Sequence, residues 1–221
     1  MASRIRFFRP SNVLSALFLA LVLLSSFVLP VSAKDSPADF PALNKFIESV
    51  TNGDAKALRG VYVKDVMAFS VIQQPANAPA FVSLVNNQVT QFNMAAQAGN
   101  VGLLAHNYLS GSFFSKLKAG DLVTIVYGDG RTESFSVTTI LKYQALEPNS
   151  VNSDFRDLET QTILSAAQLF DKVYRGERHV TFQTCIEGDG NLSWGRLFVI
   201  AKPVVLETAA PEYSYTSHIH N

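Results

Sequence analysis

The sequence predicts a mainly β domain, with the strand inventory of a barrel or a sandwich, preceded by a leader and a helix. Short runs rich in β-branched and aromatic residues, divided by turn residues, follow one another from residue 61 to residue 201. Two other segments show apolar residues at helical spacing. With 221 residues, 48% of them hydrophobic and 16% charged, the chain suffices for one globular domain with its own core.

The first segment has the layout of a signal peptide. Three arginines precede an uncharged apolar run over 13–29, and the small residue Ala33 fits a cleavage site. We therefore expect residues 1–33 to be a signal peptide, although the run is also close to the length of an N-terminal membrane anchor. Either reading places the domain outside the cytoplasm, secreted or anchored to the outer face of the cytoplasmic membrane.

Residues 34–57 are expected to form an N-terminal helical segment. The pair Ser36-Pro37 suits a helix N-cap followed by a first-turn proline. The apolar residues at helical spacing behind it are Phe40, Leu43, Ile47 and Val50. This pattern predicts a helix over 36–50, which ends near Asn52-Gly53.

Nine strand-like runs follow, and they define a barrel region over 58–203. The runs cover residues 61–63, 67–73, 81–85, 89–92, 101–106, 122–127, 134–141, 180–185 and 197–201. Gly128-Asp129-Gly130 predicts a hairpin turn between two of them, because glycine and aspartate tolerate positive φ angles. A tail over 204–221 shows no clear periodicity.

The long connection from Pro148 to Arg178 interrupts this series of strands. Its apolar residues lie on one helical face and predict a helix over 160–174. Such a helix could form the wall of a substrate groove or cap an open end of the barrel.

The charge balance argues against nucleic acid as a partner. Lysine plus arginine and aspartate plus glutamate each total 18, so no basic field is available to bind phosphates.

Cys185 is the only cysteine of the chain, so it cannot form an internal disulfide. A free thiol in an exported protein is a liability unless it is buried or used. A buried, small apolar residue is one interpretation. The position of Cys185, at the end of a strand-like run and before a glycine-rich segment over 186–191, favours an accessible nucleophile.

A cysteine nucleophile needs a proton acceptor, and four histidines are available. His218 and His220 lie in the tail, and His179 opens the strand that Cys185 ends, which places it most of a strand length away. His106, at another strand-to-loop boundary, remains as the candidate.

Arg196 is the third candidate, at the head of the run over 197–201. If this run pairs with the run before it, Cys185 and Arg196 flank the same loop. Arginine there could hold a carbonyl or a developing oxyanion. The alternative is a salt bridge to Glu187 or Asp189.

These residues together resemble the sortase family. The segment 181–185, Thr-Phe-Gln-Thr-Cys, is similar to the signature T-L-x-T-C, and Arg196 is similar to the arginine that opens the last strand. The segment 104–107 resembles the histidine segment, with Ala105 where the family usually has glycine. Residues 113–121 resemble the F-x-x-L-x-x-G-D stretch, whereas the connection over 148–178 is longer than in housekeeping members, which leaves the recognised motif open.

The resemblance implies a closed eight-stranded β-barrel and a cysteine transpeptidase without metal or cofactor. Cys185 would attack a sorting motif in a secreted protein, His106 would act as acid and base, and Arg196 would stabilise the tetrahedral intermediate. Thr184 and Asn107 would support the oxyanion or bind substrate. The acceptor would be an amine, such as a cell-wall precursor or a pilin lysine. The alternatives are a cysteine endopeptidase on the same barrel and a non-catalytic sortase-like binding module.

Overall fold

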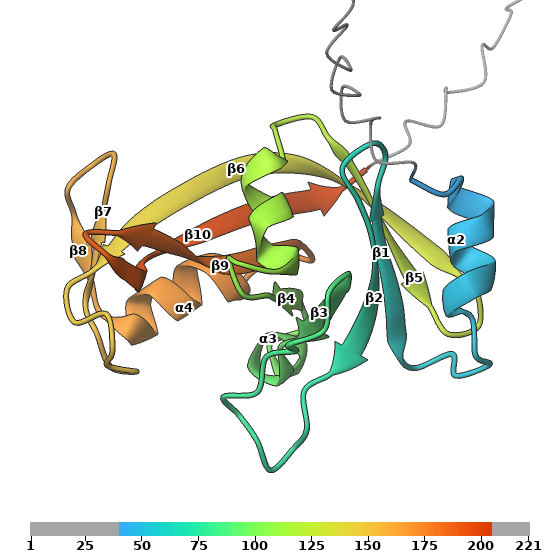
Figure 1. The fold of residues 1–221 in the computed structure, drawn as a ribbon, viewed down its shortest axis with the longest axis horizontal. Helices are drawn as coiled ribbons and strands as arrows, with labels where there is room; N and C mark the ends of the chain where they lie inside the picture. Colours follow the sequence, from blue (N-terminus) through green and yellow to red (C-terminus); the bar gives the residue numbers. More distant parts are fainter. Residues whose placement is uncertain (1–39, 205–221) are drawn as a thin grey trace, which may run out of the picture. The chain divides into compact units, whose positions relative to one another are not determined.

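A computed structural model describes residues 40–204 of the protein (Figure 1). The expected leader over 1–33 and the tail from residue 205 onward lie outside the described residues. Within the described part of the chain, no helix is both long and apolar enough to cross a membrane.

Eight strands form a closed barrel, which confirms the predicted fold class. Their order is β10-β9-β4-β3-β2-β1-β5-β6, and β6 pairs with β10 to close the ring. The barrel strands are β1 (Leu58–Val63), β2 (Met67–Gln73), β3 (Gln88–Gln91), β4 (Val101–Leu104), β5 (Leu122–Tyr127), β6 (Thr132–Ala145), β9 (Val180–Gly188) and β10 (Asn191–Pro203). Two short strands, β7 (Phe155–Asp157) and β8 (Ile163–Leu164), extend the sheet beyond β6.

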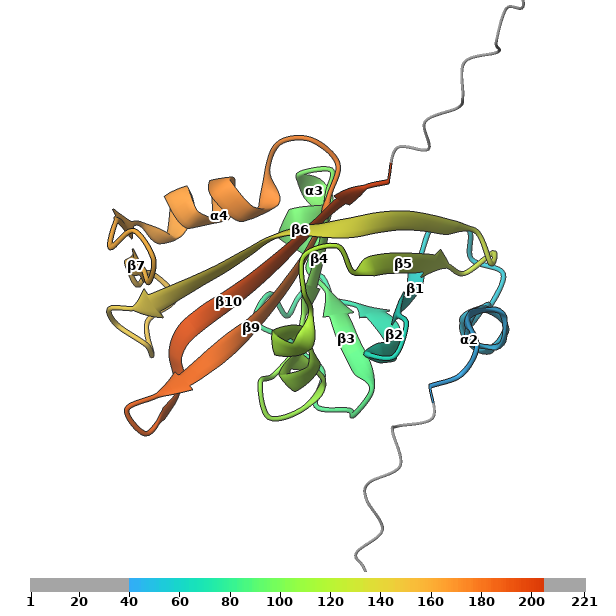
Figure 2. The same ribbon diagram turned by 90° about the horizontal axis from the view of Figure 1, so that it is seen from above.

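Two of the barrel pairings are parallel, and the others are antiparallel. β2 pairs with β3, and β4 pairs with β9, in the parallel sense. The predicted hairpin at Gly128-Asp129-Gly130 joins β5 to β6, with Gly130 at a positive φ of 85°. The long strands β6, β9 and β10 run side by side in both ribbon views (Figure 2).

Side chains alternate between the inside and the outside of the barrel along β9 and β10, as the period of a strand requires. The inward side chains of these strands, Val180, Phe182, Leu197, Val199 and Ala201, belong to the main core. Phe198 points outward into a second core beneath the helix α4 (Ala166–Tyr174). The outer wall at β9 and β10 is therefore covered by α4, which runs along it in Figure 2.

The N-terminal helix, α2 (Leu43–Val50), starts later than predicted. Phe40 is not helical because it precedes Pro41, and a residue before proline is disfavoured in the helical conformation. The helix packs Phe46 against Tyr62, with ring centroids 5.8 Å apart. Gly60 permits this approach, since a Cβ there would lie 2.9 Å from the Phe46 ring.

The predicted strand over 81–85 is wrong, because this segment is a loop. Side chains satisfy its backbone groups in place of a neighbouring strand: Gln74 Nε2 donates to the carbonyls of Pro79 and Phe81, and Ser83 N–H donates to Thr90 Oγ1. β2 pairs directly with β3 and leaves no position for another strand between them.

The predicted helix over 160–174 is correct only from Ala166 onward. Ser165 and Gln168 form a capping box, which fixes the helix start. Before it, the Asp157 carboxylate accepts hydrogen bonds from the backbone N–H groups of Glu159 and Thr160 and holds the tight β7–β8 turn. Burial opposes ionisation of Asp157, but these two N–H donors, the Tyr143 hydroxyl and the Lys172 ammonium together outweigh it and lower its pKa.

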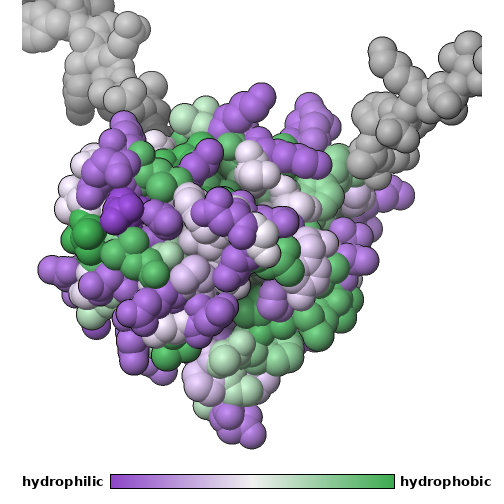
Figure 3. Space-filling view, turned by 60° about the vertical axis from the view of Figure 1, so that its left-hand side comes forward, coloured by the Kyte–Doolittle hydropathy of each residue, from purple (hydrophilic) through white to green (hydrophobic). Residues whose placement is uncertain are grey.

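On the face that Figure 3 shows, most hydrophobic side chains lie among hydrophilic ones, and others gather in a band at its lower right. The most exposed large apolar residue of the described chain is Val151, at 90%, in the β6–β7 connection. This connection also contributes to the cavity described below.

Candidate active site

Cys185 lies within β9 and not at its end, contrary to the sequence-based prediction. Arg196 likewise lies within β10 and not at its head. The two strands continue as a hairpin beyond both residues, because Asp189 and Gly190 adopt positive φ angles that reverse the chain at the far end. The thiol of Cys185 is partly exposed, so it is not sealed in the core.

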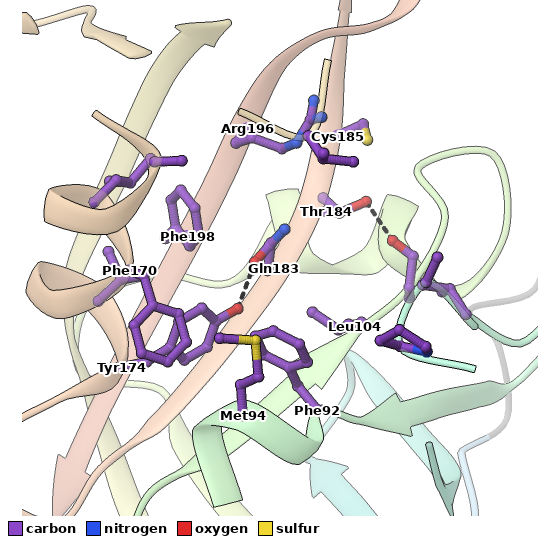
Figure 4. Close-up of a pocket in the computed structure, with 18 of the residues that line it drawn as sticks. Phe92, Met94, Leu104, Phe170, Tyr174, Gln183, Thr184, Cys185, Arg196 and Phe198 are labelled. Carbon is purple, nitrogen blue, oxygen red and sulfur yellow. Dashed lines mark hydrogen bonds between the residues drawn. The ribbon is translucent and has the colours of Figure 1, made fainter. Parts of the chain in front are cut away.

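Cys185 and Arg196 are direct cross-strand partners in the β9–β10 pairing. Opposed residues of an antiparallel pair point to the same face, with Cβ atoms roughly 4.5–5.5 Å apart. The antiparallel pairing expected from the sequence therefore places the thiol and the guanidinium side by side on the outer wall, as Figure 4 shows.

The Arg196 guanidinium is held by the backbone and not by a carboxylate. Its Nη1 donates to the carbonyls of Ser193 and Gly195, both at 2.9 Å. The four ion pairs within residues 40–204 involve other residues, so the alternative salt bridge to Glu187 or Asp189 is not formed. The charge of Arg196 thus remains available to an anionic or carbonyl ligand.

His106 reaches the same place through the parallel pairing of β4 with β9. In that register Leu104 is opposite Gln183. His106 lies two residues after Leu104, and Cys185 lies two residues after Gln183. Because the two strands are parallel, these equivalent positions lie at the same edge of the sheet. The His106 ring stacks on Tyr108, with centroids 5.2 Å apart.

The ring nitrogens of His106 are not occupied by protein partners. Within the described part of the chain, the only histidine ring that forms hydrogen bonds is that of His179, whose nitrogens contact the carbonyls of Glu177 and Val173. His179 is buried and does not line the cavity around Cys185. His106 is therefore the one described histidine able to exchange a proton there.

Thr184 fixes the backbone that carries His106. Its hydroxyl donates to the Ala105 carbonyl at 2.8 Å, from the face of β9 opposite to that of Cys185. The N–H of Gly111 donates to the His106 carbonyl at 3.0 Å, and a Cβ at Gly111 would lie 2.7 Å from that oxygen. Glycine is required at 111 because η2 (Ser110–Lys116) packs directly on this loop.

Asn107 contacts the β9–β10 hairpin and not the side chain of Cys185. Its Nδ2 donates to the Leu192 carbonyl at 3.1 Å. Asn107 therefore joins the histidine loop to the hairpin that carries Cys185 and Arg196. It lines a second hollow, of about 520 Å³, which it shares with Thr184 and Cys185.

One cavity of about 510 Å³ brings His106, Cys185 and Arg196 together. Its opposite end is aromatic, with Phe92, Phe170, Tyr174 and Phe198 around it (Figure 4). The complete lining contains no carboxylate, and Arg196 is its only permanently charged residue. The arrangement can therefore present a thiol, an imidazole and a guanidinium to a largely apolar ligand.

The walls of this cavity come from two connections. For the segment of α4 the sequence analysis left two roles open, a groove wall or a barrel cap, and in the other connection it predicted a strand over 81–85. Helix α4 supplies the aromatic wall, including Phe170 and Tyr174, so it borders a groove. The opposite wall is the loop after β2, held in place by the buried amide of Gln74. Sequence reasoning also missed Gln183 and Phe198; period-2 alternation from Cys185 and Arg196 would have placed both on the same face.

Among known proteins, similarity to this chain is found in solved structures. No protein-family model matches the sequence, and no curated protein matches it. Solved structures that match include sortase A of Listeria monocytogenes, with 14% identity and a TM-score of 0.43, covering 69% of this chain and 89% of that one. A sortase D5 transpeptidase of Clostridium perfringens has 17% identity and a TM-score of 0.44, covering 73% and 86%. Sortase C-1 of Actinomyces oris has 12% identity and a TM-score of 0.45, covering 79% and 91%.

The closed eight-stranded barrel is the fold that the sequence resemblance implied. Identities below 25% and TM-scores below 0.5 assign neither an activity nor a substrate. Those must be inferred from the side chains of the site itself.

Proposed function

We propose that this protein is a sortase-type cysteine transpeptidase that acts outside the cytoplasm. The observation that carries the proposal is the cross-strand pair of Cys185 and Arg196 on the wall of one cavity with His106. The guanidinium has no carboxylate partner and the imidazole no protein partner among residues 40–204. An imidazole without a protein partner and a guanidinium without a carboxylate partner can both act on a ligand beside the thiol.

The proposed reaction transfers an acyl group from a peptide to an amine. The Cys185 thiolate attacks the scissile carbonyl carbon, and Arg196 with nearby backbone N–H groups stabilises the resulting oxyanion. His106, as imidazolium, donates its proton to the departing amine when the C–N bond breaks, which leaves a thioester. An incoming amine then transfers a proton to His106 and attacks the thioester carbon, and the thiolate of Cys185 departs.

A peptide library with and without added amine tests this proposal. Purified protein is incubated with peptides from secreted proteins, and products are identified by mass. A product that joins the N-terminal fragment to the amine supports a transpeptidase, and hydrolysis alone supports a cysteine endopeptidase. If no peptide is cleaved and Cys185 does not react with thiol reagents, the protein is a binding module and the proposal fails.

Export is the proposal that follows from the leader at residues 1–33. We expect the protein to fractionate outside the cytoplasm of its host, because a basic start and an apolar run direct the chain to export. N-terminal sequencing of the exported protein should begin at Lys34 if the leader is cleaved after Ala33. Recovery of full-length chain from the soluble cytoplasmic fraction would contradict this expectation.

Replacement of Arg196 by methionine should lower kcat/KM by about 10²- to 10³-fold, because loss of one hydrogen-bond donor to a developing oxyanion typically slows a reaction by about that factor. Methionine keeps an apolar, unbranched side chain but removes the guanidinium, whose central carbon lies 5.9 Å from the centroid of the Phe155 ring. The matched control is Arg131→Met, which removes an exposed guanidinium that is paired with Asp129 and does not line the cavity. Peptide cleavage by the two variants is compared, and equal activities would argue against a role for Arg196.

A further inference from the structure

Gln183 presents an unused hydrogen-bond donor beside the proposed nucleophile. It precedes Cys185 by two residues on β9, so the two side chains point to the same outer face, and both line the cavity. Gln183 is partly exposed. Its Oε1 accepts a hydrogen bond from the Tyr174 hydroxyl, and its Nε2 donates to no residue in 40–204.

Tyr174 fixes the orientation of this amide. Tyr174 is 2% exposed and packs against Phe92 and Phe170, with ring centroids 5.3 and 5.2 Å away. Burial raises the pKa of its hydroxyl, so the group stays a neutral donor. Because Gln183 Oε1 is the only acceptor of that proton among the described residues, the amide nitrogen must point the other way. Figure 4 shows the nitrogen directed away from Tyr174, toward the end of the cavity that holds Cys185 and Arg196.

We propose that Gln183 is a substrate-binding residue that donates to one backbone carbonyl of the acyl part of the substrate, and that Tyr174 is its positioning residue. This inference rests on the proposed transpeptidase function. Two residues of β9 span roughly 6.4–6.8 Å, the span of two residues of an extended peptide lying along it. The carbonyl in question therefore belongs two residues before the scissile carbonyl.

We expect this part of the groove to bind the acyl part of the substrate. The acyl part stays attached to Cys185 while one amine leaves and another enters, so it needs binding contacts through both half-reactions. The groove continues past Gln183 to the aromatic end under α4, which provides that length. A ligand that covers the Gln183 amide without offering an acceptor leaves its N–H groups unpaired, which selects against it.

A double-mutant cycle with alkylating peptides measures the proposed hydrogen bond. The probe is acetyl-Phe-Ala-Ala-Ala chloromethyl ketone, in which the Cys185 thiolate displaces chloride to form a thioether. A second probe carries an alkene in place of the amide whose carbonyl lies two residues before the ketone. We expect the alkene probe to alkylate the native protein about 3- to 10-fold more slowly than the amide probe. This ratio of rates corresponds to the loss of one hydrogen bond. With Gln183→Leu, the two probes should react at similar rates.

Two further variants test the Gln183 donor and its positioning residue, Tyr174, separately. Gln183→Glu retains an acceptor for Tyr174 but removes the donor, and it should also abolish the discrimination between amide and alkene. Tyr174→Phe leaves Gln183 in place but frees its amide to rotate, so the ratio should fall toward one. Unfolding in urea verifies that each variant folds.

Iodoacetamide distinguishes failure of this inference from failure of the proposed function. It is too small to depend on the groove, so it should alkylate Cys185 at equal rates in the native protein and in Gln183→Leu. If it does not modify Cys185 in the native protein, both proposals are overturned. If it does, but the ratio of amide to alkene rates is the same with and without Gln183, the transpeptidase proposal stands and the role of Gln183 is overturned.

Discussion

Replacement of Cys185 by alanine is expected to lower peptide cleavage and transfer by about 10³-fold or more, because the substitution removes the atom that would form the thioacyl bond. The fold should tolerate the change, since the side chain is partly exposed and stands on the outer wall of the barrel. The free energy of unfolding should change by less than about 1 kcal/mol. Turnover and urea denaturation of the same preparations measure both quantities.

Cys185→Ser is the matched control for this prediction. It retains the size and position of the side chain and changes only the nucleophilic atom, so it should be as inactive as the alanine variant. Loss of cooperative unfolding in either variant would instead indicate that the thiol serves packing. Retention of activity by the alanine variant would remove Cys185 from the mechanism.

Replacement of His106 by alanine is expected to lower kcat/KM by about 10²- to 10⁴-fold, the contribution typical of a positioned acid and base. The ring has no hydrogen-bond partner within the described chain and stacks only on Tyr108, so its removal breaks no internal polar contact. Added imidazole should restore part of the activity, because it can occupy the vacated space and carry the proton. Rates measured over a series of imidazole concentrations test this expectation.

Tyr108→Phe is the control for the histidine variant. It keeps the aromatic face on which the His106 ring stacks and removes only an exposed hydroxyl. We expect nearly native turnover and no response to imidazole. A His106→Ala variant with native activity would contradict the assigned role of the imidazole.

Local sequence patterns predicted most of the strands. The runs over 67–73 and 122–127 coincide with β2 and β5. The first alternates in burial and the second is a continuous apolar and β-branched run, and both are local signals of a strand. The run over 81–85 has the same local composition, yet it is a loop, with Leu84 71% exposed. This run does not form a strand because β2 pairs directly with β3, and no local sequence pattern indicates that contact between separate segments.

Element ends were harder to predict for the same reason. β9 continues past Cys185 to Gly188 because β10 pairs with it there, although the glycine-rich sequence alone indicates a loop. The helix expected from Thr160 starts at Ala166, since the Ser165–Gln168 capping box and the turn at Asp157 together decide where it begins. The spacing of apolar residues along the sequence indicates neither the β9–β10 pairing nor the interactions that fix the start of the helix.

The sequence by itself determined the mainly β class and the three residue types that the proposed chemistry needs, in their order along the chain. These features depend on residue identity and on short-range periodicity, both of which are present before folding. The tertiary structure alone decided that β4 and β9 are parallel, that Leu104 is opposite Gln183, and that the groove runs along the outer wall under α4. Strand pairing between distant segments depends on the packing of the whole chain, because a shift of one residue in register would turn every side chain to the other face.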